Sequence, residues 1–188
     1  MAVRRPAVPA AGRRAPAPHV AARHGGAGDD LPVARCAVVT VSDTRGPQRD
    51  LSGDRIARGL ERAGHRVVWR AWVRDDVAAI RRVARAALAR RGVDAVVLTG
   101  GTGVAPRDRT PEALRPLLQQ DLPGFGELFR LLSYRQVGPA AWLSRAGAGV
   151  AKGRLMMWLP GSPRAVDLAV AKLIGPELRH ALRLLAGP

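Results

Sequence analysis

Apolar runs alternate with amphipathic segments from Ala34 to the end of the chain. Residues 35–42, 93–98 and 154–159 carry Val, Leu and other apolar side chains at consecutive positions. Such runs are typical of strands that are covered on both faces in a parallel sheet. Residues 66–73 instead place apolar side chains at every second position, which predicts a more peripheral strand.

The segments between these runs carry apolar residues at helical spacing. A first helix is predicted to begin near Ser52 or Asp54, either of which could cap it, and to end at Gly64. A second helix is predicted to start at Asp75 and Asp76. The alternation of strands and helices along the chain is the pattern of an α/β domain with a parallel sheet.

Further helices are predicted in the second half of the chain. The pair Thr110-Pro111 has the residue types of a helix cap and a first helical position. Helices are also expected over 125–134 and 164–185, the last with a kink at Gly175-Pro176. Residues 140–150 show no clear periodicity, so no element is assigned to them.

Two regions of the chain differ in composition. Residues 1–32 are rich in Ala, Pro, Arg and Gly and hold almost no large apolar side chains, so we interpret them as a flexible extension. Residues 33–188 are expected to form one α/β domain, which is long enough to bury its own core. Since no apolar run has the length of a membrane span or a secretory signal, we expect a cytoplasmic protein without membrane contact.

The formal net charge of +16 raises the question of nucleic-acid binding. The arginines are dispersed over nearly every segment, and Lys152 and Lys172 are the only lysines. This distribution favours a surface that generally attracts anions over a specific nucleic-acid site. Cys36 is the only cysteine, which excludes an intramolecular disulfide and a multi-cysteine metal site, and it is expected to be buried in a strand.

A glycine-rich segment follows the apolar run 93–98. Thr99-Gly100-Gly101-Thr102-Gly103 would stand at the C-terminal end of a strand, where open α/β sheets bind ligands, and its bare N–H groups could contact a phosphate or an electron-rich ring. Its spacing matches neither the dinucleotide GxGxxG pattern nor the P-loop. A tight turn without function is the alternative, but the following Arg107-Asp108-Arg109 favours a binding loop.

Two shorter motifs repeat this arrangement. Gly161-Ser162 follows the strand 154–159, and Ser162 with Pro163 would begin the last helix, whose free N–H groups favour an anion. Ser52-Gly53-Asp54 lies at the predicted start of the first helix, where it could bind an anion or serve only as a capping turn. Two or more such sites imply a ligand with several negative groups.

Four acidic residues, Asp43, Asp54, Asp75 and Asp108, follow predicted strands or stand at helix starts. Carboxylates that converge on bound phosphates usually act through Mg²⁺, which neutralises charge during phosphoryl or nucleotidyl transfer. Asp75 could equally serve only as a helix cap. The sequence indicates no structural role for Asp108, so Asp108 is the stronger candidate for a catalytic residue.

Seven short motifs lie within a region of resemblance to a known family that covers Arg35 to about Leu185. They are VVTVSDTRG, SGD at 52–54, AGH at 63–65, TGGTGVAPRDRTPEAL, PGFGELFRLLSY, LSRAGAGV and LPGSP. In this order they resemble the molybdenum cofactor biosynthesis proteins of the MogA/MoaB type, and TGGTG with the following RD and TPEAL is the most specific part. The resemblance implies a three-layer α/β/α sandwich with a mostly parallel central sheet, often assembled as a homotrimer or a hexamer.

The resemblance also implies an activity. Proteins of this type bind molybdopterin, and the MogA-like ones transfer AMP from Mg·ATP to its terminal phosphate and release pyrophosphate. ATP and molybdopterin would then be substrates and Mg²⁺ the cofactor. The pterin loops would be Thr99–Gly103 and Gly161-Ser162, with Ser42-Asp43 lining the same crevice. The carboxylates of adenylyl transfer, which would also hold Mg²⁺, would be Asp75 and Asp108.

Other features keep a second possibility open. Arg74 precedes Asp75 where MogA-like members often carry Pro, and PEALRPLL and FGELFRLLSY resemble the MoaB branch, in which some proteins lack a clear catalytic role. The alternative is a molybdopterin carrier or scaffold that uses the same loops without AMP transfer, with other cofactor biosynthesis proteins as its partners. Glu127 and Arg130 belong to the family pattern and would contact either the ligand or a subunit interface.

Overall fold

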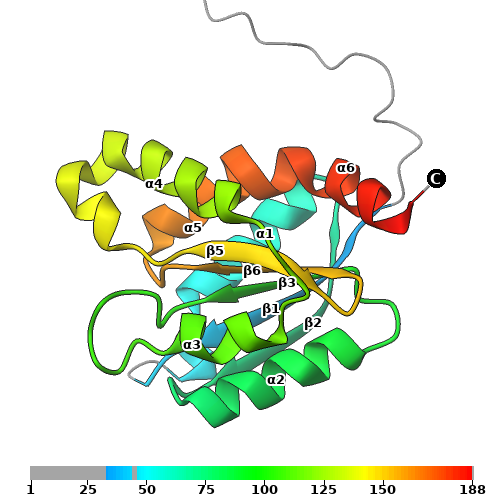
Figure 1. Ribbon diagram of the computed structural model, residues 1–188, viewed down its shortest axis with the longest axis horizontal. Coiled ribbons are helices and arrows are strands. Elements are labelled where there is room, and N and C mark those ends of the chain that lie inside the picture. Colours follow the sequence, from blue (N-terminus) through cyan, green and yellow to red (C-terminus); the bar gives the residue numbers. More distant parts are fainter. Residues whose placement is uncertain (1–32, 44–45, 188) are drawn as a thin grey trace, which may run out of the picture.

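The computed structural model describes residues 33–43 and 46–187, so the extension predicted for 1–32 lies outside the described residues. Six strands form one sheet in the order β2-β1-β3-β6-β5-β4 (Figure 1). The strands are β1 (Arg35–Val41), β2 (Arg66–Val73), β3 (Ala95–Thr99), β4 (Gln120–Asp121), β5 (Gly147–Ala151) and β6 (Arg154–Leu159). The strand predicted as peripheral, β2, lies at an edge of this sheet.

The sheet is parallel over its first four strands. β1 pairs in parallel with β2 and β3, and β3 pairs in parallel with β6. β5 runs antiparallel to both of its neighbours. It joins β6 through a two-residue turn in which Lys152 and Gly153 have φ values of 51° and 68°, as tight hairpin turns require. The prediction of a mostly parallel sheet is therefore confirmed.

Helices cover both faces of the sheet, so the domain has three layers (Figure 1). The α-helices are α1 (Leu51–Arg62), α2 (Val77–Ala89), α3 (Thr110–Leu114), α4 (Pro123–Val137), α5 (Pro163–Ala169) and α6 (Gly175–Ala186). Short 3-10 turns cover η1 (Pro47–Arg49), η2 (Arg115–Leu117) and η3 (Gly138–Leu143), and a π-helical turn covers η4 (Val170–Ile174).

Alternate strand residues supply two separate cores. On one face, Cys36 and Val38 of β1 pack with residues of α1, α4, α5 and α6. On the other face, Ala37 and Val39 pack with residues of α2 and α3. Burial raises the pKa of the Cys36 thiol to about 12, so this side chain is a protonated core residue, as the sequence predicts.

Two predicted helix starts, those of α1 and α3, are wrong in their capping residue. Asp50 caps α1 by accepting a hydrogen bond from Gly53 N (2.9 Å), so Ser52 and Asp54 lie inside the first turn. The start predicted for α2 at Asp75 and Asp76 is confirmed, and of the two it is Asp76 that caps the helix by accepting from Ala79 N (2.7 Å). In each case the carboxylate directly before the helix is the one that reaches an unpaired N–H of the first turn.

The second wrong start is at α3. Thr110 is its first helical residue rather than its cap, because the Thr110 hydroxyl donates to Gly100 O (2.8 Å) instead of accepting from the helix. The closing helix is interrupted by the π-helical turn η4, directly before the predicted kink at Gly175-Pro176. Pro176 has no N–H to donate one turn back, which favours the wider turn at this point.

Candidate functional site

A cavity of about 320 Å³ opens at the C-terminal ends of β1, β3 and β6. Most of the residues predicted for a ligand site line this cavity: Ser42, Asp43, Ser52, Asp75, Thr99, Gly100, Gly101, Thr102, Gly103, Asp108 and Gly161. The parallel strands bring these residues together because their C-terminal ends meet at one edge of the sheet.

Three predicted residues do not line the cavity. Gly53 N donates to the Asp50 carboxylate, Asp54 forms an ion pair with Arg70 (2.7 Å), and the Ser162 side chain caps α5 by accepting from Ala165 N (3.3 Å). For Ser52-Gly53-Asp54, the sequence left open a capping turn as the alternative. The structure uses Gly53 in the capping turn and Asp54 in an ion pair, whereas Ser52 lines the cavity.

Glycine is required at two positions of the loop after β3. Gly100 has φ +103°, and a Cβ there would lie 2.0 Å from Val41 O at the end of β1. Gly101 has φ +62°, and a Cβ there would lie 2.5 Å from both Asp75 Oδ2 and Thr110 Oγ1. The bare backbone therefore lets the loop pass against β1 and lets a carboxylate approach it closely.

Hydrogen bonds tie the three strand-end segments to one another. Gly100 N donates to Leu159 O (2.9 Å), and the Thr99 hydroxyl donates to Pro160 O (3.0 Å). The Ser52 hydroxyl donates to Gly161 O (2.8 Å). Two of these bonds join the end of β3 to the end of β6, and the third joins the start of α1 to the same segment after β6, so these walls of the cavity are fixed relative to one another.

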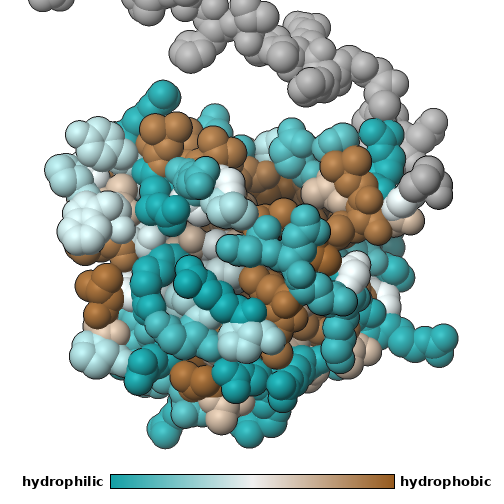
Figure 2. Space-filling view, viewed as in Figure 1, coloured by the Kyte–Doolittle hydropathy of each residue, from teal (hydrophilic) through white to brown (hydrophobic). Residues whose placement is uncertain are grey.

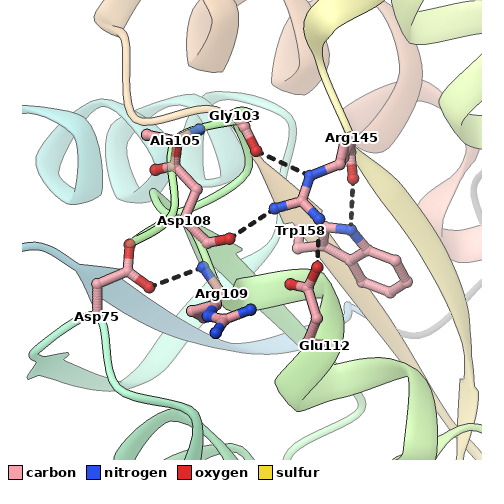
Figure 3. Close-up of polar contacts among 8 residues, drawn as sticks. All are labelled: Asp75, Gly103, Ala105, Asp108, Arg109, Glu112, Arg145 and Trp158. Atoms are coloured by element: carbon pink, nitrogen blue, oxygen red, sulfur yellow. Dashed lines mark hydrogen bonds and ion pairs between the residues drawn. The ribbon is translucent and has the colours of Figure 1, made fainter.

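Asp75 lies at the centre of the acidic part of the cavity. Its N–H donates to Asp43 Oδ1 (3.0 Å), and its own Oδ1 accepts from Arg109 N (3.1 Å) (Figure 3). Burial raises the pKa of Asp75, the bond from Arg109 N opposes this rise, and the charges of Asp108 and Asp43 add to it. Asp75 does not cap α2, so its carboxylate is not used for that structural purpose.

Asp108 has a structural contact that the sequence did not reveal. Its Oδ2 accepts a hydrogen bond from Ala105 N (3.0 Å), which closes the tight turn before it. A Cβ at Gly103 would lie 2.7 Å from the same oxygen, so Gly103 makes room for this carboxylate. Asp108 thus both shapes the loop and lines the cavity beside Asp75 (Figure 3).

Asp50 is a cavity residue that the sequence analysis missed. Its side chain is only 9% exposed, and it accepts hydrogen bonds from the Thr40 hydroxyl (2.8 Å), Gly53 N and Arg70 (3.1 Å). A Cβ at Gly53 would lie 2.2 Å from the Asp50 carboxylate. The signal that could have found it is an Asp three residues before a glycine in the first turn of a helix.

Both signs of charge are present around the cavity. Arg49 and Arg107 line it together with the carboxylates of Asp43, Asp75 and Asp108. Within 33–43 and 46–187, no group of three or more His, Cys, Asp or Glu side chains is arranged to hold a metal ion by itself. A divalent cation could still be held by Asp75 and Asp108 together with phosphate oxygens of a ligand, which is how Mg²⁺ is usually bound.

Comparisons with known proteins agree on one family. Residues 37–180 match the family described as "Probable molybdopterin binding domain". The molybdenum cofactor biosynthesis protein B of Bacillus subtilis is 48% identical over 152 residues, which are 80% of this chain and 89% of the relative. None of the helices in the described part of the chain is long and apolar enough to cross a membrane.

Solved structures agree with the sequence comparison. A crystal structure of a molybdenum cofactor biosynthesis protein B superposes with a TM-score of 0.81 at 42% identity, covering 84% of this chain and 99% of that chain. The molybdopterin biosynthesis Mog protein from Mycobacterium ulcerans superposes with a TM-score of 0.73 at 32% identity, covering 84% of this chain and 100% of that chain. The three-layer α/β/α fold with the mostly parallel sheet is common to all three proteins.

Proposed function

The chain belongs to the molybdopterin-binding domain family of molybdenum cofactor biosynthesis proteins, and on that premise we propose that it adenylylates molybdopterin in the strand-end cavity. The substrates are molybdopterin and Mg·ATP, and the products are adenylylated molybdopterin and pyrophosphate. One observation carries the proposal: Asp75 and Asp108 lie together beside a glycine-rich loop in a cavity that arginines also line.

The loop after β3 suits the phosphate and ring of a pterin ligand. Gly100 and Gly101 expose backbone where any side chain would clash, so a planar ring or a phosphate can approach the N–H groups closely. Arg49 and Arg107 add positive charge at the same cavity. These features suit a ligand that carries several negative charges, and both molybdopterin and ATP are such ligands.

The reaction is an in-line displacement at phosphorus. A terminal phosphate oxygen of molybdopterin forms a bond to the α-phosphorus of ATP while the bond from that phosphorus to the bridging oxygen of pyrophosphate breaks. The N–H groups of the fixed loop backbone orient the reacting phosphates and stabilise their charge. Bound Mg²⁺ supplies further charge neutralisation, and Asp75 and Asp108 are the residues that would hold it.

The proposal also includes assembly into a homotrimer or a hexamer. Large apolar side chains are exposed along α4 and η3, which is unusual for a surface that faces only water. They are Leu128, Leu131, Tyr134, Val137, Trp142 and Leu143. Figure 2 shows hydrophobic side chains gathered over the part of the surface where α4 lies in Figure 1.

Pyrophosphate release tests the catalytic part of this proposal. The purified chain is assayed with Mg·ATP and molybdopterin, each omitted in turn, alongside Asp108→Asn and the control Asp121→Asn. Asn at 108 can still accept from Ala105 N, so the loop keeps its shape while the charge is lost. We expect release by the wild type to need both substrates, and Asp108→Asn to lower it by about a hundredfold or more.

A molybdopterin-binding assay distinguishes an adenylyltransferase from a carrier or scaffold that uses the same cavity. We expect Asp108→Asn to bind molybdopterin within about threefold of the wild type, because the glycine-rich loop still provides the contacts. Asp121 is exposed on β4, at the far edge of the sheet, so its replacement should change neither quantity. A wild-type protein that binds molybdopterin without releasing pyrophosphate would be a carrier or scaffold, and the catalytic assignment would fail.

A further inference from the structure

The segment from Gly103 to Asp108 is called the Asp108 loop here. Arg145 contacts this loop from the side opposite to Asp75 (Figure 3). Its Nε donates to Gly103 O (2.8 Å), at the start of the loop, and one terminal nitrogen donates to Asp108 O (2.6 Å), at its end. The other terminal nitrogen forms an ion pair with Glu112 in the first turn of α3. One planar guanidinium thus joins both ends of the loop to the helix that follows it.

The backbone of Arg145 is itself fixed on both sides. Its N–H donates to Thr102 O (2.9 Å), and its carbonyl accepts from the indole N–H of Trp158 (2.9 Å), which is buried in β6. Arg130 of α4 donates to the neighbouring carbonyls of Ser144 (3.4 Å) and Ala146 (3.5 Å). The side chain is therefore projected from a rigid strand end.

Thr110 closes the base of the loop by donating to Gly101 O (2.9 Å) and Gly100 O (2.8 Å), but the segment between Gly103 and Asp108 has few other bonds. Residues 104–107 are exposed, and the bonds within the loop are those between Ala105 and Asp108. On the cavity side, Arg109 N donates to Asp75 Oδ1. Removing the Arg145 fork would leave two backbone carbonyls without their partner and would free the segment between Gly103 and Asp108.

The contact between Arg145 and Glu112 also changes the pKa of Glu112. Burial acts to raise the pKa of the Glu112 carboxyl, but the hydrogen bond and the charge of Arg145 outweigh it and hold this pKa below its ordinary value. Glu112 in turn holds the guanidinium against the start of α3. The pair thereby fixes the orientation in which Arg145 faces the two loop carbonyls.

We propose that Arg145 is a positioning residue for adenylyl transfer, holding the Asp108 loop so that the Asp108 carboxylate lies beside Asp75. The inference rests on the proposed function for its role in the reaction, whereas the positioning of the loop can be tested separately. Arg145 does not line the cavity and acts through the loop that it holds. Because catalysis depends on placement to within a fraction of an ångström, a loosened loop slows the chemical step more than it weakens binding.

The test compares Arg145→Gln and Arg145→Lys with the control Arg35→Gln. Arg35 also makes a two-pronged contact with a carboxylate, through Nε (3.1 Å) and a terminal nitrogen (3.0 Å) to Asp94, but at the opposite ends of the strands. The measurements are kcat and KM for pyrophosphate release with molybdopterin and Mg·ATP. Amide hydrogen exchange over residues 103–109 is measured in the same proteins.

We expect Arg145→Gln to lower kcat by about 10- to 100-fold while both KM values change by less than about threefold. Arg145→Lys keeps the charge but loses the planar fork, so its kcat should stay close to that of the Gln variant. The amides of the loop should exchange at least about tenfold faster in both variants. Arg35→Gln should change neither kcat nor this exchange.

Each contrary result overturns a definite part of the inference. A wild-type kcat in Arg145→Gln, or a Lys variant as active as the wild type, would contradict a positioning role for the guanidinium fork. If the wild-type protein releases no pyrophosphate, the proposed function fails, and hydrogen exchange alone decides whether Arg145 holds the loop. Unchanged exchange over 103–109 would then remove the positioning role as well.

Discussion

At the scale of single residues, the carboxylate of Asp75 is held where its charged form is disfavoured. Burial and the charges of Asp108 and Asp43 raise its pKa, and the one bond from Arg109 N does not offset them. A group whose folded-state pKa is raised binds its proton more tightly in the folded protein than in the unfolded chain. Its contribution therefore favours folding at low pH and is lost as the pH rises from 3.8 through the higher folded value.

Asp75→Asn should therefore stabilise the protein at neutral pH in the absence of metal. The Asn carbonyl can still accept from Arg109 N, while the buried charge is gone. We expect a higher melting temperature than that of the wild type at pH 7, with a difference that shrinks toward pH 4. Thermal unfolding in EDTA across this range measures it, and an equal or lower melting temperature at pH 7 would contradict the raised pKa.

The residues of the site could be predicted from the sequence where the chain itself shows why they are needed. Gly100 and Gly101 stand in an unusual run after a buried strand, and the structure gives the reason in their positive φ values and close contacts. Asp50 was missed because its partners, Thr40 and Arg70, lie on strands whose pairing one sequence does not reveal. Arg145 was missed for the same reason.

At the scale of elements, the start of α1 depends on Asp50. This carboxylate caps the helix, accepts from the Thr40 hydroxyl of β1 and pairs with Arg70 of β2. It therefore joins one helix to two strands. Asp76 at the start of α2 has the same capping bond, but its side chain is exposed and no strand residue is bonded to it in the described structure.

Asp50→Ala should destabilise the protein by about 2–3 kcal/mol, since it removes a cap and leaves the buried Thr40 hydroxyl without its acceptor. Asp76→Ala is the matched control, and it should cost about 1 kcal/mol, the usual value for a cap. Chemical denaturation of both variants gives the comparison. Equal losses in the two variants would show that the contacts of Asp50 to the strands contribute nothing.

Long, apolar elements could be predicted, and short or glycine-rich ones could not. β1, β3 and β6 have continuous apolar runs that only a covered strand explains. β4 has two residues and β5 reads Gly-Ala-Gly-Val-Ala, so neither carries the β-branched pattern of a strand. β5 forms because its small residues fit close neighbours: a Cβ at Gly147 would lie 2.4 Å from the Trp158 ring.

At the scale of the whole molecule, the apolar face of α4 and η3 is the surface on which the proposed assembly depends. Leu131 is 60% exposed on this face, whereas Leu184 on α6 is 67% exposed outside it. We expect Leu131→Glu to reduce the mass in solution from a multiple of 20.0 kDa to that of one chain, and Leu184→Glu to leave it unchanged. Light scattering on a size-exclusion column measures both.

A mass of one chain for the wild-type protein would contradict the assembly outright. A multiple that survives Leu131→Glu would place the subunit contact on another surface. The three-layer arrangement itself could be predicted only through the resemblance to a known family, because periodicity shows which elements exist but not which helix covers which face. The extension predicted over 1–32 stays a prediction.

The hydrogen bonds that build the cavity also bear on the stage of folding at which it closes. Asp43 and Asp75 are joined across 32 residues, Asp75 and Arg109 across 34, Arg145 and Asp108 across 37, and Ser52 and Gly161 across 109. Each of these closures costs chain entropy before the contact is gained, so the strands must already be paired when the cavity closes. We therefore expect the binding site to assemble late in folding, after the strands that carry its residues have paired.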